Sequence, residues 1–303
     1  MSNRDITTSD PAAIEAALTE RFGDHEPAGG GADGIAQLAD ALAAEGRSFD
    51  ALAAAAAHRS HRAFDDRDVP LPLLQTLAAI ALSAPSKSDL QQRDIIILDD
   101  ADQVARIKAC LSDQAWTADA PRVLIFCGNN RRQRQVHELR AKPFANDHLD
   151  AFFNAAVDAG IALQAFIAAA EYAGLGCCPI SAIRNRAREV SDILALPDHV
   201  FPVAGLGVGW PTEPDRFRIS YRLPLAATVH VDRFDDHGIA DQIAAYDRRR
   251  AEAQPYATQR GVDRFGAVPT TDYTWSEDKA RQYAEAERED FGAFVVKKGF
   301  TLK

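Results

Sequence analysis

The chain has 303 residues, 47% of them hydrophobic and 26% charged, and its formal net charge is −10. This length allows one large domain or two ordinary ones, and the acidic balance argues against nucleic acid as the main partner, because such binding depends on phosphate neutralisation. The four cysteines, Cys110, Cys127, Cys177 and Cys178, have neither zinc-site nor disulfide-framework spacing, which suits a reducing compartment. The polar N-terminus has no apolar signal core, so we expect a cytoplasmic protein.

Residues 1–50 are predicted to form a helical N-terminal appendage. Helical spacing predicts one helix from Pro11, capped by Asp10, and a second helix over 35–45 that Gly46 ends. The glycine-rich stretch PAGGGADG separates the two helices. We find no motif with recognisable chemistry in this segment.

Residues 51–237 alternate between helical and strand patterns and are predicted to form the core domain. The patterns predict helices over 71–84, 101–113, 150–173 and 187–196, and strands over 94–100, 122–128, 200–210 and 226–234. These strands are too few for a doubly wound sheet, so we expect an α+β sandwich in which helices flank a mixed central sheet. Helix 150–173 contains Asn154, Asp158 and Glu171, which favours a buried helix over a membrane span.

Residues 238–303 form a highly charged tail. The pattern predicts a helix over 239–254, a loop over 260–275 and a long helix over 276–299. Ser276 is a good cap for the last helix, and Asp278 suits its first turn. We therefore expect a separate C-terminal extension.

The stretch AHRSHRAFDD gathers four potential cations, His58, Arg59, His61 and Arg62, directly after an alanine-rich segment. Basic residues near a helix C-terminus offset its dipole, whereas a cluster of guanidinium groups also suits a pocket for one small anion. The residues alone leave both readings open. Neither a Rossmann fingerprint nor a P-loop occurs, no nucleophile–base arrangement has local context, and the glycines of GLGVGWP are best explained by close packing.

Seven segments, taken together and in this order, carry a family resemblance. They are HRSHRAF, SAPSKSDLQQRDIII, GLGCCPISAIRN, YRLPL, AAYDRRRAEAQPYATQRG, YTWSE and FVVKKGFTLK. This combination resembles the nitroreductase family of flavoenzymes over about residues 52–303, and its tail resembles that of the major oxygen-insensitive NADPH nitroreductases and NADPH:flavin reductases. The resemblance implies FMN bound at a homodimer interface, hydride transfer from NAD(P)H to a nitroaromatic, quinone or flavin acceptor, and ping-pong kinetics.

The resemblance assigns the opening basic stretch to the FMN phosphate. Guanidinium forks and hydroxyl groups suit a phosphate because charge-assisted hydrogen bonds are short and strong. The residues carried over are His58, Arg59, Ser60, Arg62 and, from YRLPL, Arg222. Ser220 occupies the position at which the family usually has a lysine, so one expected cation is replaced at this point.

Further residues are implied to lie beside the flavin ring. The resemblance gives polar contacts to Ser86 and Ser88, with Asp89 where many relatives have Asn, and an amide contact to Gln114. The loop whose backbone faces the flavin corresponds to Pro179, Ile180, Ser181 and Ala182, where close relatives have an aromatic residue, Ile and two glycines. The Cβ atoms of the last two residues are expected to restrict approach and to exclude positive φ angles.

The tail is implied to select the nucleotide. Arg260 and Arg264 lie in the loop at which the NADPH-specific relatives hold the 2′-phosphate, a group that a cation matches well. A solvated charged loop is the alternative. The tail's last helix is expected to wrap a partner subunit, and the small residues of helix 150–173 are expected to form the core of a homodimer.

The chemistry is expected to reside in FMN, with NADPH as co-substrate, and not in a dedicated catalytic side chain or a metal. Two alternatives remain: a flavin-binding protein with a different redox reaction or without turnover, and a structural α+β dimer that has lost its cofactor. Cys177 and Cys178 are expected to be buried small residues, not redox partners, because a disulfide between adjacent residues is strained. Neither nucleic acid nor a membrane is expected as a partner.

Overall fold

The computed structural model describes residues 11–23, 31–112, 114–212 and 218–303. The chain divides into two compact units, each built from two separate stretches of sequence. Unit 1 comprises residues 1–59 and 218–287, and unit 2 comprises residues 60–217 and 288–303. The predicted appendage therefore lies wholly in unit 1, and the predicted tail is divided between the two units.

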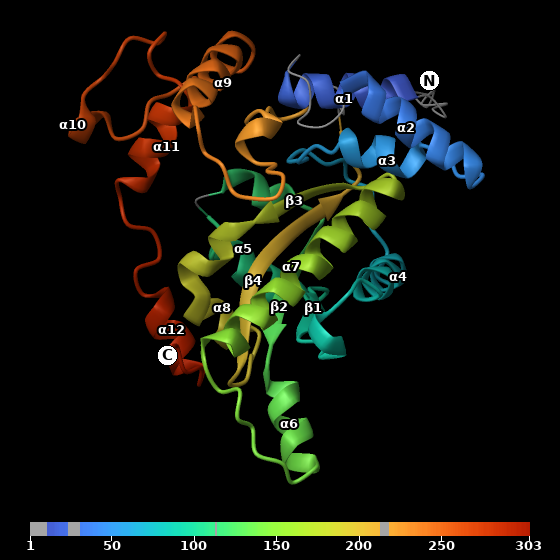
Figure 1. Ribbon diagram of the computed structural model, residues 1–303. Helices are drawn as coiled ribbons and strands as arrows, with labels where there is room; N and C mark the ends of the chain where they lie inside the picture. The colour runs from blue at the N-terminus through green and yellow to red at the C-terminus, as the bar shows by residue number, and fades with distance from the viewer. Residues whose placement is uncertain (1–10, 24–30, 113, 213–217) are drawn as a thin grey trace. The chain divides into compact units, whose positions relative to one another are not determined.

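Unit 2 is built around a four-stranded sheet with the strand order β1-β2-β4-β3 (Figure 1). Its strands are β1 (Arg93–Ile97), β2 (Arg122–Asn129), β3 (Gly176–Ile180) and β4 (Val200–Gly209). All three neighbouring pairs are antiparallel. The expected mixed sheet is therefore antiparallel in its four strands, and Ser60 and Cys177 form an isolated parallel bridge at its β3 edge.

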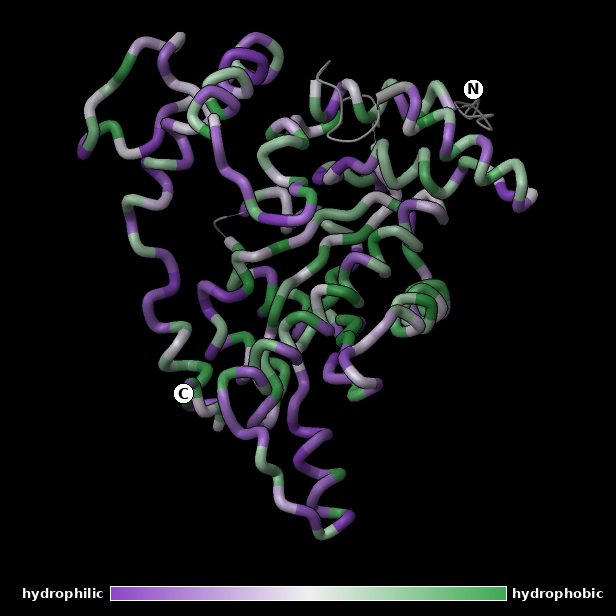
Figure 2. Tube along the Cα trace, viewed as in Figure 1, coloured by the Kyte–Doolittle hydropathy of each residue, from purple (hydrophilic) through white to green (hydrophobic). Residues whose placement is uncertain are grey.

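Helices cover both faces of this sheet because successive residues of β2 point to opposite sides. Leu124 and Phe126 join one apolar cluster with α4 (Leu71–Leu82) and α7 (Leu149–Tyr172). Val123 and Ile125 join another with α5 (Ala101–Ala109) and α8 (Ala187–Ile193). Figure 2 shows the central strands and α4 largely in the hydrophobic colour. The predicted α+β sandwich is confirmed, and apolar side chains of the flanking helices cover both faces of its sheet.

Helix α7 has the length and apolar composition that crossing a membrane would require. It instead packs along the sheet of unit 2 (Figure 1), with Ala155, Ala159, Ala162 and Phe166 fully buried on one side. Asp158 is also buried on this helix and accepts two hydrogen bonds from unit 2. The packing and the satisfied carboxylate are those of a core helix.

The remaining elements of unit 2 are short. They are η1 (Lys87–Asp89), η2 (Ala115–Asp119), α6 (Arg131–Leu139), η3 (Ser181–Arg186) and α12 (Phe291–Lys297). Helix α12 packs through Phe294 and Val295 against Phe201 of β4. The buried Lys298 then donates to Ser191 Oγ at 3.1 Å, which fastens the C-terminal segment to α8.

Unit 1 consists mainly of helices. They are α1 (Pro11–Phe22), α2 (Gly31–Ala44), α3 (Asp50–Ala56), η5 (Leu225–Ala227), α9 (Ile239–Ala253), α10 (Val262–Phe265) and α11 (Trp275–Tyr283). Ile14, Phe49 and Ala53 form a small apolar cluster in which α1 packs on α3. The two predicted appendage helices are confirmed, and the expected cap Asp10 lies outside the described residues.

Three sequence predictions are corrected. The predicted strand over 226–234 is a turn-rich segment, because among the described residues it has no neighbouring strand to satisfy its backbone groups. The predicted helix over 276–299 is two helices, since α11 belongs to unit 1 and α12 to unit 2. The predicted cap is wrong as well, because α11 begins at Trp275 and Ser276 lies inside it, where its amide and hydroxyl donate to Asp247.

Candidate functional site

The second half of the basic stretch lies against β3 in unit 2. Ser60 pairs with Cys177 in the parallel bridge, and the His61 amide donates to the Cys177 carbonyl at 2.9 Å. Gly176 permits this approach, because a Cβ at that position would lie 2.8 Å from the His61 Cβ. The structure therefore brings Ser60 and Arg62 to the strand that leads directly into Pro179–Ala182.

Arg62 is exposed, and its positive charge lies near the thiol of Cys178. Burial raises the pKa of that thiol, and the charge of Arg62 partly opposes the rise. Beyond Cys178 the side chains alternate, with Pro179 and Ser181 exposed and Ile180 buried. A basic group and an exposed strand end thus share one edge of the sheet.

Ser181 and Ala182 open η3, and neither has a positive φ. The backbone at these two positions is therefore compatible with a Cβ, as expected from the residue types. Pro179 has no amide hydrogen, so this segment offers one backbone donor fewer than an ordinary residue would provide. The segment retains the amides of Ile180, Ser181 and Ala182.

All four cysteines are buried, and burial raises the pKa of each thiol. For Cys127 the rise reaches about 12. Cys177 and Cys178 occupy successive positions of β3, so their side chains point to opposite faces and cannot approach without breaking the strand. The expectation that they are buried small residues is confirmed.

We predict that the native protein resists thiol modification. The thiolate is the reactive form, and raised pKa values leave these buried groups protonated at neutral pH. A disulfide reagent such as DTNB should therefore react with four thiols in denatured protein and with none rapidly in native protein. Fast labelling of Cys177 or Cys178 in folded protein would contradict this picture of the strand.

His58, Ser220 and Arg222 lie close together in unit 1. One buried side chain, Arg21 of α1, connects them, because its guanidinium donates to the carbonyls of His58 at 2.7 Å and Ser220 at 3.2 Å. The Arg222 amide donates back to the Arg21 carbonyl at 2.8 Å. Backbone segments far apart in sequence are thus joined through Arg21, and Arg222 is exposed. Arg59 follows directly and is half-buried.

The segment that carries Ser86 and Ser88 has a strained backbone. Ser88, Asp89 and Gln91 have φ angles of 49°, 56° and 52°, the left-handed region that non-glycine residues seldom adopt. Each such residue costs about 1–3 kcal/mol and persists where its surroundings hold it. This loop, residues 83–92, therefore needs strong fastening from the rest of unit 2.

Asp158 provides the first fastening. Its carboxylate, which is 1% exposed, accepts from the Lys87 and Gln92 amides, both at 3.0 Å. A carboxylate that accepts two amide hydrogens is a strong loop anchor, since hydrogen bonds to charged groups are about twice as strong as neutral ones. Asp158 is thus a buried carboxylate that backbone amides satisfy.

Arg93 provides the second fastening. Its guanidinium, on a side chain that is 5% exposed, donates to the carbonyls of Leu82, Ala84 and Pro85. It thereby satisfies the carbonyl of Leu82, the last residue of α4, and two carbonyls of the loop that follows. Asp158 and Arg93 are buried groups of opposite charge, and they bind the backbone of this loop at several points. Ser86 and Ser88 therefore lie on a rigid support.

We predict that Asp158→Asn loosens this loop. An asparagine offers one acceptor oxygen and places a donor amide against a second N–H, so hydrogen exchange at Lys87 and Gln92 should accelerate about tenfold or more. The free energy of unfolding should fall by about 1–3 kcal/mol. The exposed Asp150→Asn on the same helix is the control. Unchanged exchange at both amides in Asp158→Asn would contradict the anchoring role.

Gln114 also lies in unit 2, where its amide hydrogen donates to the Leu111 carbonyl at 2.8 Å and its carbonyl accepts from Thr117. Its backbone is therefore fixed at the start of η2, while its side chain is exposed. The side-chain amide is free to point away from the helix it precedes.

Arg260 and Arg264 lie in unit 1 beside α11. Arg260 Nε is 3.2 Å from the carboxylate of Asp278, which is buried, while the Arg260 side chain is 56% exposed. Burial alone would raise the pKa of Asp278, but hydrogen bonds from Lys279 and Tyr273 outweigh it and hold that pKa below its ordinary value. Arg264 donates to the Ala284 carbonyl at 3.0 Å. Asp278 thus orients one exposed guanidinium.

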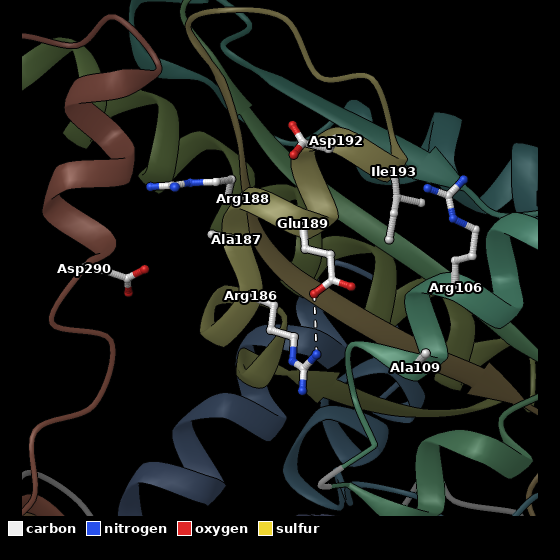
Figure 3. A pocket seen from close by; sticks show the side chains of 9 residues that line it. All are labelled: Arg106, Ala109, Arg186, Ala187, Arg188, Glu189, Asp192, Ile193 and Asp290. Atoms are coloured by element: carbon white, nitrogen blue, oxygen red, sulfur yellow. Dashed lines mark hydrogen bonds and ion pairs between the residues drawn. The ribbon is translucent and has the colours of Figure 1, made fainter.

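Unit 2 also contains a cavity of about 530 Å³ away from the predicted residues. Figure 3 shows Glu189 paired with Arg186, while Arg106, Arg188, Asp192 and Asp290 stand around the opening. Positively and negatively charged side chains both line this cavity, so it has no net preference for an anion. A smaller cavity of about 130 Å³ is lined by Gln92, Asn130, Gln133, His137 and other residues. Neither cavity includes a residue implied by the resemblance.

Comparison with known proteins decides the family. The model of the nitroreductase family matches residues 55–210, and the model of that family's C-terminal domain matches residues 221–303. The chain belongs to the nitroreductase family. An FMN reductase [NAD(P)H] of Bacillus subtilis is 31% identical over 251 residues, which cover 81% of this chain and 96% of that protein.

Two further relatives of this family member agree with the match. An oxygen-insensitive NADPH nitroreductase of Salmonella typhimurium is 30% identical and covers 81% of this chain and 96% of its own length. The solved structure of NfrA2 from Bacillus megaterium has a TM-score of 0.72 and 34% identity, over 84% of this chain and 99% of that one. The predicted family and fold are confirmed. The first 54 residues lie outside the family match.

Sequence reasoning missed the residues that support this family member's candidate site. Arg21, Arg93 and Asp278 act through hydrogen bonds to distant backbone or side-chain groups. Asp158 alone left a signal, as a carboxylate within an apolar helix. Arg21 and Arg93 left none, because a backbone carbonyl carries no mark in the sequence, and Asp278 was expected only to suit the first turn of its helix.

Proposed function

We infer that this chain is an FMN-dependent NAD(P)H oxidoreductase. The expected activity class is borne out by the names of its relatives, an FMN reductase [NAD(P)H] and an NADPH nitroreductase, each matched over nearly its full length. The observation that carries the assignment on this chain is the placement of Ser60 and Arg62 against β3, next to the segment 179–182. Basic groups for a phosphate and backbone donors for a ring meet at one sheet edge.

The donor set has the chemistry that an FMN phosphate requires. We assign the phosphate contacts that the resemblance implies to His58, Arg59, Ser60, Arg62 and Arg222. Arg62 and Arg222 are exposed guanidinium groups, and such groups form short charge-assisted bonds with phosphate. Ser220 contributes its backbone carbonyl to Arg21 and leaves its hydroxyl exposed.

We assign ring contacts to Ser86 and Ser88 of the anchored loop, to the Gln114 amide, and to the backbone of 179–182. When bound, FMN supplies the hydride-accepting and hydride-donating chemistry. The protein's part is to hold the ring in place and to supply fixed hydrogen-bond donors, which cost no reorganisation during reaction. No side chain is assigned a catalytic proton transfer.

We propose NADPH as the preferred nucleotide, a homodimer as the working form, and the cytoplasm as the location. The exposed Arg260, oriented by Asp278, supports the nucleotide preference. The exposed side of α7 supports the dimer, since Phe153 and Val157 leave apolar surface there at 60% and 43% exposure. Sedimentation that finds a stable, active, flavin-loaded monomer would overturn the dimer.

Steady-state kinetics test the proposed function. NADPH oxidation should depend on added FMN and on a quinone or nitroaromatic acceptor, and double-reciprocal plots at several acceptor concentrations should be parallel, as in ping-pong turnover. A protein that binds FMN but oxidises neither nucleotide would support the alternative, a flavin protein with another redox reaction or without turnover. Failure to bind FMN would leave only the structural dimer.

A further inference from the structure

The N-terminal helix α1 contributes a buried arginine to the surroundings of the predicted phosphate residues. Arg21 is 8% exposed, and its guanidinium donates to three backbone carbonyls, those of Ala56, His58 and Ser220. Ala56 is the last residue of α3 and His58 lies just beyond it, and the last carbonyls of a helix need partners outside the helix. One side chain therefore caps α3 and also reaches the segment that leads to Arg222.

A second set of hydrogen bonds joins the Arg21 backbone to Arg222 and Arg249. The Arg21 carbonyl accepts from the Arg222 amide at 2.8 Å and from Arg249 Nη2 at 2.9 Å. Arg249 Nη2 also lies 3.1 Å from the Arg222 carbonyl. The backbone on both sides of the Arg222 side chain is thus tied to residue 21. Packing of Ile14 on Phe49 and Ala53 holds α1 itself in place.

We propose that Arg21 is a positioning residue for the FMN phosphate, which fixes the backbones of His58 and Ser220–Arg222 relative to each other. This role rests on the proposed function. A rigid fork that bridges two segments lets their side chains converge on one anion without further loss of conformational freedom on binding. Residue 21 lies before the part matched by the family, so the N-terminal segment of this chain adds a function to the shared core.

The charge of Arg21 has a further consequence. Its guanidinium lies at the Ser220 carbonyl, the position at which the resemblance leads us to expect a lysine. A buried cation in this place adds positive potential beside the predicted phosphate residues, and partial burial reduces its screening by salt. The N-terminal helix therefore supplies charge as well as geometry.

Two titrations of the full-length apoprotein test the role. FMN and riboflavin share the ring and differ in the phosphate, so a phosphate-positioning residue should affect only FMN. We expect Arg21→Met to raise the Kd for FMN about tenfold or more and the Kd for riboflavin by less than about twofold. Arg21→Lys should show a smaller FMN-selective loss, since an ammonium keeps the charge but donates from one nitrogen, whereas the guanidinium reaches Ser220 and the end of α3 from two different nitrogens.

The exposed neighbour Glu20→Gln is the matched control and should leave both Kd values unchanged. Circular dichroism confirms that each variant is folded at the titration temperature, and Arg21→Lys carries the test if Arg21→Met does not fold. A merely structural role would lower the melting temperature and leave the ratio of the two Kd values unchanged, which would overturn the proposal alone. A wild-type chain that binds neither flavin would overturn the proposed function and this role with it.

Discussion

Arg222→Ala should weaken FMN binding by about 10- to 150-fold. A charge-assisted hydrogen bond is worth roughly 1.5–3 kcal/mol, and Arg222 presents an exposed guanidinium on a backbone that Arg21 and Arg249 hold in place. Arg62→Ala should have an effect of the same size, because Arg62 is exposed beside β3. Fluorescence titration of the apoprotein with FMN measures both.

Arg218→Ala is the control for this pair, since Arg218 is an exposed arginine in the same stretch of unit 1 as Arg222. It removes the same charge from the chain and should change the Kd for FMN by less than about twofold. Retention of FMN through gel filtration by both Arg62→Ala and Arg222→Ala, with unchanged titration curves, would show that the phosphate assignment is wrong.

Arg260→Ala should raise the KM for NADPH and lower kcat/KM about tenfold or more, with NADH kinetics nearly unchanged. The two nucleotides differ in the 2′-phosphate, and Arg260 offers a guanidinium that is more than half exposed and held at Nε by Asp278. Asp278→Asn should reproduce part of the effect, because it releases the orientation of Arg260 and leaves its charge in place. Steady-state assays with both nucleotides measure these changes.

Arg248→Ala, at an exposed position of α9, is the control for nonspecific loss of charge in unit 1. It should affect neither nucleotide by more than about twofold. Equal losses for NADPH and NADH in Arg260→Ala would refute the 2′-phosphate assignment, as would a wild-type enzyme that already prefers NADH.

The elements with strong local patterns could be predicted from the sequence. Strands β2 and β4 are continuous apolar runs between turn signals, and the structure places them within one or two residues of the expected bounds. Helix α7 was equally clear. Strand β3 was missed because its sequence GCCPI has no alternation, and its extended state depends on pairing with the distant β4.

The wrong predictions arose where tertiary structure overrides a local preference. Residues 226–234 contain β-branched residues in partial alternation, but Val231 and Phe234 are 75% exposed and belong to no strand. Residues 276–299 read as one helix, yet their two halves pack in different units. A local stretch of ten to twenty residues does not determine either result, because both depend on contacts with distant parts of the chain.

The candidate site also has residues that could be predicted from the sequence and residues that could not. The order of the motifs led to the family and to the predicted ligand-facing residues. The roles of Arg21 and Arg93 beneath those residues could not be predicted, because they bind backbone groups that any sequence would provide. Asp158 stood out only as a carboxylate within an apolar helix, and its partners, the amides of Lys87 and Gln92, carried no signal. The strained loop 83–92 was hidden for the same reason, since positive φ angles at Ser88, Asp89 and Gln91 have no signature in these residue types.

Anaerobic mixing of the flavin-loaded protein with NADPH tests the central claim most directly. We expect the visible flavin absorbance to fall on addition of NADPH and to return on addition of a quinone or nitroaromatic, with one flavin per chain. A protein that takes up no FMN, or a yellow protein whose absorbance neither NADPH nor NADH changes, would contradict the assignment of this chain as an FMN-dependent NAD(P)H oxidoreductase.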